Sequence, residues 1–117
     1  MQQQQIEVQR ANGKTVHLSI GVADSFWTRF LGLMGRSRMP TEMDGLLLTH
    51  TKQIHMFFMK FPINTYHLDG RGRVVGIEHA VSPGRIGRRV LTTEHILEVP
   101  SDRLLPIALG DRLCLPQ

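Results

Sequence analysis

The sequence predicts a small, mainly β domain: a β-sandwich or barrel of about seven short strands with one helix in its N-terminal half. Short apolar runs alternate with turn signals along most of the chain. A single stretch, about residues 24–34, has apolar residues at helical spacing. The 117 residues, 41% of them hydrophobic, suffice for one core. We therefore expect one domain over residues 1–117, with a frayed lead-in at 1–5.

Two hairpins are the most local β signals. An alternating strand ends at Asn12-Gly13 and a second follows over 15–22; Asn-Gly between two such runs is a strong hairpin signal. Residues 63–78 repeat the arrangement around an Asp-Gly-Arg-Gly turn at 69–72. Further strands are expected over 45–50, 54–61, 93–99 and 112–115.

The predicted helix begins near Asp24 or Ser25, either of which can cap its free amides. Its apolar face consists of Phe26, Phe30, Leu31 and Met34. Such a stripe is more often a core face than a cofactor site, so we expect it to pack on the sheet.

Positive charge is concentrated in one part of the chain. The net charge is +4, and residues 71–89 hold five arginines but a single acid, Glu78. The arginines of this segment are Arg71, Arg73, Arg85, Arg88 and Arg89. A planar guanidinium suits a carboxylate or phosphate, although a solvated loop would have the same composition. No aromatic residues accompany these arginines, so we do not expect nucleic acid as the partner.

Lys60 lies in an apolar run just before Pro62. In a cleft, burial would lower the pKa of its ammonium group and make it an anion anchor or a base. Arg29, Arg36 or the segment 85–89 could assist it in holding a carboxylate or phosphate. The alternative is that the side chain reaches along the surface to solvent.

The same run contains His55, Met56 and Met59, and soft ligands of this kind suit copper. On an extended strand, however, His55 and Met59 would be about 13 Å apart, too far to share one ion. Core packing is the alternative role for these methionines. The chain has no Gly-x-Ser-x-Gly motif, no P-loop and no zinc-type pairing of its histidines. We therefore predict no metal and no cofactor.

The N-terminus has four glutamines after Met1 and no apolar signal region. No stretch is long enough to span a membrane. We therefore expect a cytoplasmic protein without a membrane partner. Cys114 has no second cysteine to pair with.

Several motifs, in their order, resemble those of the DUF192 family. They are Arg-Phe-Leu-Gly-Leu-Met-Gly-Arg at 29–36, Met39-Pro40, Asp-Gly-Leu-Leu at 44–47, the central run at 55–64, Glu-Val-Pro at 98–100 and Leu-Gly-Asp-Arg-Leu at 109–113. The resemblance implies a small β-sandwich-like domain and no assigned activity. Asn64 stands where this family usually has Asp, so a carboxylate role there does not carry over.

These observations lead to a hypothesis of a non-enzymatic binding module for a small anionic ligand or an acidic partner surface. Its candidate ligand-binding residues are Lys60, Arg36, Arg29, Arg85, Arg88, Arg89, His55 and Met59. Two alternatives stay open: an enzyme with Lys60 or His55 as a pocket base, and a copper protein using His55, Met56 and Met59.

Overall fold

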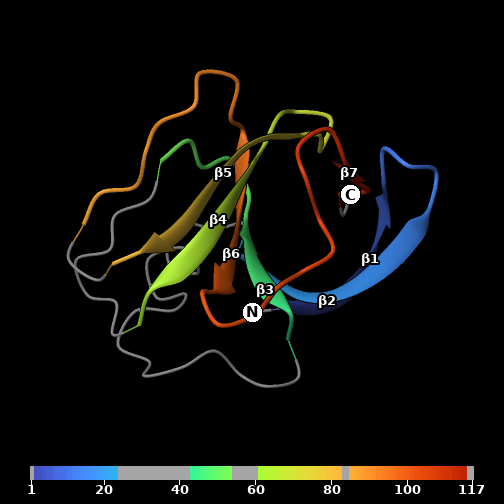
Figure 1. Cartoon of the computed structure of the whole chain (residues 1–117), viewed down its shortest axis with the longest axis horizontal. Coiled ribbons are helices and arrows are strands. Elements are labelled where there is room, and N and C mark those ends of the chain that lie inside the picture. Colours follow the sequence, from blue (N-terminus) through green and yellow to red (C-terminus); the bar gives the residue numbers. More distant parts are fainter. Residues whose placement is uncertain (1, 24–42, 54–60, 83–84, 116–117) are drawn as a thin grey trace.

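Seven β-strands form one sheet in the computed structural model, which describes residues 2–23, 43–53, 61–82 and 85–115. In chain order the strands are β1 (Gln2–Gln9), β2 (Thr15–Ala23), β3 (Gly45–Leu48), β4 (Ile63–Leu68), β5 (Val74–Val81), β6 (His95–Pro100) and β7 (Arg112–Leu113). Their order across the sheet is β5-β4-β6-β3-β2-β1-β7 (Figure 1).

Both predicted hairpins are present. β1 and β2 pair antiparallel from Gln2↔Val22 to Gln9↔Thr15, and Gly13 takes the positive φ of 88° that their turn requires. β4 and β5 pair antiparallel around the predicted turn at 69–72. The other contacts join strands far apart in sequence: β6 lies antiparallel between β4 and β3, whereas β2 and β3 are parallel.

The sheet curls until its two ends meet. β7 pairs with β1 on one side, and on the other side Arg112 forms a bridge with Arg73, just before β5. Leu113 N donates to Gly72 O at 2.8 Å and Val74 N donates to Asp111 O at 2.8 Å. Of the two predicted architectures, the described strands therefore adopt the barrel-like one.

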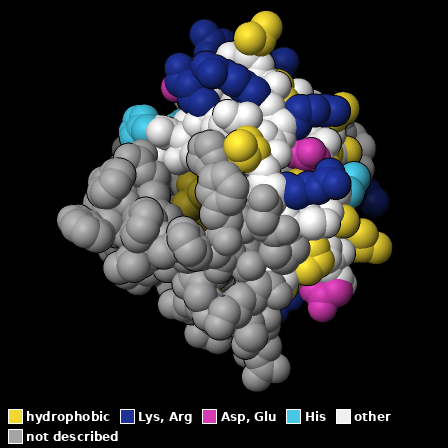
Figure 2. Space-filling model, turned by 90° about the vertical axis from the view of Figure 1, so that its left-hand side faces the viewer, with side chains coloured by type: hydrophobic (Ala, Val, Ile, Leu, Met, Phe, Trp, Pro, Cys, Tyr) yellow, Lys and Arg dark blue, Asp and Glu magenta, His cyan; other side chains and the backbone are white. Residues whose placement is uncertain are grey.

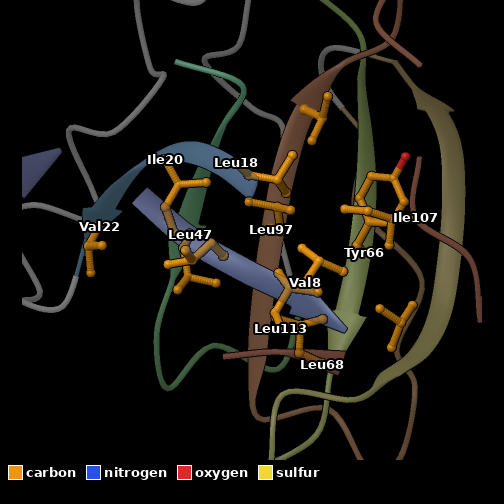
Figure 3. Packing of buried hydrophobic residues seen from close by; sticks show 13 residues of the cluster. Val8, Leu18, Ile20, Val22, Leu47, Tyr66, Leu68, Leu97, Ile107 and Leu113 are labelled. Carbon is orange, nitrogen blue, oxygen red and sulfur yellow. The ribbon is translucent and has the colours of Figure 1, made fainter. Parts of the chain in front are cut away.

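The inside of the curled sheet is the main hydrophobic core (Figure 3). Alternate residues of the strands point into it, as the two-residue period of a strand requires. The fully buried members include Val8, Ile20, Leu47, Leu68, Leu97, Val99 and Leu113. Removing these side chains from water supplies most of the driving force for closing the sheet.

A second cluster lies on the opposite, outer face of β3, β4 and β6. It consists of Met43, Leu46, Leu48, Ile63, Val81 and Ile96, with Phe61 packed against it. Strands β3, β4 and β6 are thus buried on both faces, which explains the continuous apolar run of β3 and the largely apolar sequence of β6.

The described residues confirm the mainly β prediction and contain no helix. The expected helix over 24–34 and most of the expected strand over 54–61 lie outside the described residues. Residues 2–5, expected to fray, instead belong to β1, because their backbone pairs with residues 19–22. In the ranges that the structure describes, no helix is long and apolar enough to cross a membrane.

Candidate functional site

Four buried polar residues lie together around β4 and β6. Thr65 and His67 are on β4, Glu98 is on β6, and Thr93 lies just before β6. Thr65 is paired with Glu98 across the two strands, so both project from the outer face beside the second apolar cluster. We refer to Thr65, His67, Thr93 and Glu98 as the outer polar cluster.

Two hydroxyl groups fix the imidazole of His67. Its Nδ1 lies 3.1 Å from Thr93 Oγ1, and its Nε2 lies 3.4 Å from Thr65 Oγ1. Burial lowers the pKa of His67 below its usual value; Arg88 adds to this effect and Glu78 opposes it. The ring is therefore neutral near pH 7, with one nitrogen donating and the other accepting.

Glu98 is the most unusual member of the outer polar cluster. The residue lies on β6 and is 6% exposed. Burial raises the pKa of Glu98 to about 7, from an ordinary value of 4.5. A substantial fraction of this carboxyl is therefore protonated at neutral pH and able to donate a hydrogen bond.

Glu78 connects the outer polar cluster to the arginine-rich loop. On β5 it is paired with Thr65, on the side away from Glu98. One of its carboxylate oxygens, Oε1, accepts a hydrogen bond from the backbone N–H of Arg88 at 2.8 Å. This hydrogen bond holds the loop that carries Arg88 against β5, next to the outer polar cluster.

Two further contacts hold this loop, which we call the arginine loop (residues 85–91). Gln53 Nε2 donates to the carbonyl of Gly87 at 2.8 Å. A Cβ added at Gly76 would lie 2.8 Å from a methyl group of Val90, so Val90 packs directly on the β5 backbone. The loop backbone is therefore positioned by side-chain contacts at both Gly87 and Arg88.

The side chains of Arg85, Arg88 and Arg89 are exposed. The ion pairs of the described residues are Arg10–Asp111 and Lys52–Glu94, so none of these three arginines is neutralised by a described acid. Figure 2 looks from the side on which the loop lies in Figure 1, and Lys and Arg side chains gather in the upper part of that view. The loop thus presents guanidinium groups to solvent on a fixed backbone.

Only part of the predicted site can be placed. The structure brings Arg85, Arg88 and Arg89 into the arginine loop. The remaining candidates lie outside the described residues; they are Arg29, Arg36, His55, Met59 and Lys60, together with Met56 of the copper alternative. Among the residues that are described, no group of three or more His, Cys, Asp or Glu could hold a metal ion.

Comparison with protein families matches residues 7–115 to the model of DUF192 (Uncharacterized ACR). The chain belongs to the DUF192 family. Comparison with curated proteins gave no match.

Two solved structures share the fold of this DUF192 chain. A Sinorhizobium meliloti 1021 protein, described as a proposed transcription regulator, is 21% identical with a TM-score of 0.76, over 96% of this chain and 92% of that one. A Novosphingobium aromaticivorans DSM 12444 protein of unknown function is 19% identical with a TM-score of 0.80, over 97% of this chain and 85% of that one. At these identities the likeness concerns the fold.

The Asn64 position of this DUF192 chain has a structural explanation. Asn64 Oδ1 accepts a hydrogen bond from Ala80 N at 2.9 Å, where Ala80 has a positive φ of 53° and the β4–β5 register shifts. The position needs an oxygen acceptor to hold this irregularity. Either Asn or Asp can supply that acceptor.

Sequence reasoning missed the outer polar cluster. A signal was present, because Glu98 interrupts the apolar run Ile-Leu-Glu-Val-Pro at 96–100. The same type of signal drew attention to Lys60. An ionisable residue inside an apolar strand is worth singling out because its burial shifts its pKa.

Proposed function

We propose that this DUF192 chain is a non-enzymatic binding module for a small anionic ligand or an acidic partner surface, with the arginine loop as its anchor. The observation that carries the proposal is the fixed loop backbone, held through Glu78 and Gln53, beneath three exposed arginines that no described acid neutralises. A guanidinium held in this way loses little conformational entropy on binding. Lys60, Arg36 and Arg29 remain predicted contributors.

The test is a thermal-melt screen with phosphate, sulfate, carboxylates and nucleotides. A ligand at about 100 times its dissociation constant adds roughly 2.7 kcal/mol, which raises the melting temperature of a domain of this size by roughly 10 °C. We expect at least one anion to give such a shift, and Arg88→Ala to remove most of it.

Lys14→Ala is the matched control. Lys14 is exposed and also carries one positive charge, but it lies in the β1–β2 turn, on the opposite side of Figure 1 from the arginine loop. Equal loss of binding in both variants would mean that net charge, and not the loop, attracts the anion. A flat response of the wild-type protein to every anion and to acidic peptides would refute the proposal.

DNA belongs in the same screen because one structural neighbour is described as a proposed transcription regulator. Nucleic acid is not the expected partner. Binding to DNA that weakens steeply with salt and requires Arg88 would redirect the proposal towards nucleic acid.

The second candidate function is an enzyme, and Glu98 is the observation that favours it. A buried carboxyl with a pKa of about 7 is suited to general acid–base catalysis. Turnover in a panel of ester, phosphoester and glycoside substrates, lost in Glu98→Gln, would support this candidate. Lys60 and His55 remain predicted alternative bases, and copper binding by His55, Met56 and Met59 remains a prediction that Cu(I) dialysis can test.

A further inference from the structure

The arginine loop carries two exposed aliphatic side chains beside its arginines. Leu91 is 94% exposed and Ile86 is 54% exposed. They lie at the two ends of the run Ile-Gly-Arg-Arg-Val-Leu, and residues 79–93 contain no acid. A leucine fully in water forgoes the free energy of its burial. In this loop the two aliphatic side chains stand beside arginines, so a partner that is both anionic and apolar could contact both kinds of group.

The loop is built to present these side chains outward. Its backbone is held through Glu78 at Arg88 and through Gln53 at Gly87. At its far end Thr93 N donates to Val90 O at 3.0 Å, which closes a turn with Leu91 at its tip. The loop reaches the top of Figure 1.

The chemistry of the loop fits a lipid surface better than a protein surface. A standard protein interface buries roughly 800 Å² on each partner around an apolar centre rich in aromatic residues. Residues 79–93 contain no Phe, Tyr or Trp, and their exposed aliphatic side chains, Ile86 and Leu91, are separate from one another in the chain. A bilayer interface accepts single aliphatic side chains between its headgroups, and its anionic lipids attract nearby arginines.

We propose that the arginine loop docks the protein peripherally on an anionic membrane surface, with Leu91 and Ile86 entering the headgroup region and Arg85, Arg88 and Arg89 contacting lipid phosphates. This inference rests on the proposed function, because the same arginines hold the anions. The inference departs from the expectation of no membrane partner, which was based on the absence of a membrane-spanning stretch; peripheral docking needs no such stretch.

The experiment is co-sedimentation with vesicles of phosphatidylcholine alone and of two parts phosphatidylcholine to one part phosphatidylglycerol. We expect binding to the mixed vesicles and little to the neutral ones. Leu91→Ser is expected to weaken binding about tenfold, as loss of one buried leucine side chain implies. Arg88→Ala is expected to weaken binding and to reduce its salt dependence.

Leu104→Ser is the matched control, because Leu104 is 89% exposed but lies outside the arginine loop. Its binding should equal that of the wild type. If Leu91→Ser binds as tightly as wild type, the insertion of Leu91 is refuted.

A parallel titration with inorganic phosphate separates the inference from the proposed function. Phosphate binding that requires Arg88, without vesicle binding, overturns the inference and leaves the anion site standing. If the protein binds neither phosphate nor vesicles, both the inference and the proposed function are overturned. Binding to acidic peptides but not to vesicles assigns the loop to a protein partner and also overturns the inference.

Discussion

Glu98 is a carboxylic acid on a strand whose other residues from 96 to 100 are Ile, Leu, Val and Pro. Its backbone contributes to the pairing of β6 with both β3 and β4, while its side chain is almost wholly buried. Burial of a charged carboxylate costs stability. Proteins keep such groups mostly where function needs them.

Glu98→Gln should therefore stabilise the protein at pH 8 and change its stability little at pH 4. Below 4.5 the carboxyl is protonated in both the folded and the unfolded state, so it adds no pH dependence. Between 4.5 and about 7 it ionises only in the unfolded state, so the free energy of unfolding falls as pH rises. The rise in the pKa of Glu98 from 4.5 to about 7 corresponds to about 3 kcal/mol in the free energy of unfolding.

Urea denaturation of the wild type and the variant at several pH values measures this difference. Asp102→Asn serves as the control, because Asp102 is an acidic residue that is exposed. Parallel curves for wild type and Glu98→Gln across this pH range would show that the Glu98 carboxyl is solvated or paired in solution.

At the same scale, the sequence singled out only the exposed residues of the candidate site. Arg85, Arg88 and Arg89 were predicted because charges crowded in a loop are visible in the chain itself. His67 and Glu98 were missed because their burial depends on strands and loops that fold over them from distant segments. The interruption of an apolar run by Glu98 is visible in the sequence, but no local pattern shows that the second face of its strand is covered.

At the scale of elements, local signals predicted local structure. The β1–β2 and β4–β5 hairpins were predicted because their turn residues specify the reversal within a few positions. The parallel contact of β2 with β3 and the insertion of β6 between β3 and β4 were not predicted. Both depend on packing between segments tens of residues apart.

Gly72 lies where the two ends of the sheet meet, and the close approach of β7 there requires a glycine. Gly72 has a φ of +85°, and a Cβ added there would lie 2.1 Å from Leu113 O. Gly72→Ala must therefore displace β7, whose Leu113 N donates to Gly72 O. We expect destabilisation on the order of 3 kcal/mol or more, measured by urea denaturation.

Gly13→Ala separates steric clash from backbone strain. Gly13 has a similar φ of +88°, but a Cβ added there would meet nothing within 4 Å. Gly13→Ala should lower the free energy of unfolding by about 1 kcal/mol, because only the left-handed conformation of the new alanine is unfavourable. Equal losses at the two sites would mean that the contact of residue 72 with β7 contributes no stability.

At the scale of the whole molecule, Asp111 joins three distant parts of the chain. Its Oδ1 accepts from Ala11 N at 2.9 Å, and its Oδ2 accepts from Ala108 N at 2.8 Å and from Arg10 Nε at 3.1 Å. Its own backbone carbonyl accepts from Val74 N at the start of β5. The β1–β2 turn and the segment before β7 thus meet at the buried carboxylate of Asp111, and β5 is joined to the same residue through its backbone carbonyl.

Asp111→Asn should therefore weaken the whole fold, by about 2 kcal/mol at pH 7. Burial alone would raise the pKa of Asp111, but the bonds from Ala11, Ala108 and Arg10 outweigh it and lower the pKa below 3.8. The stabilisation is thus present above pH 3.8 and is lost as pH falls through the lowered value. An Asn side chain has one acceptor oxygen and no charge, so it leaves at least one of the three donors unsatisfied.

Urea denaturation should show a lower free energy of unfolding for Asp111→Asn than for wild type at pH 7. This difference should become smaller at pH 2. Asp102→Asn, which changes an exposed acid, should show little gap at either pH. Because Asp111 ties both ends of the closed sheet, probes of the core and of the β1–β2 hairpin should report the same loss. A loss confined to the hairpin would mean that Asp111 secures one turn and does not hold the barrel closed.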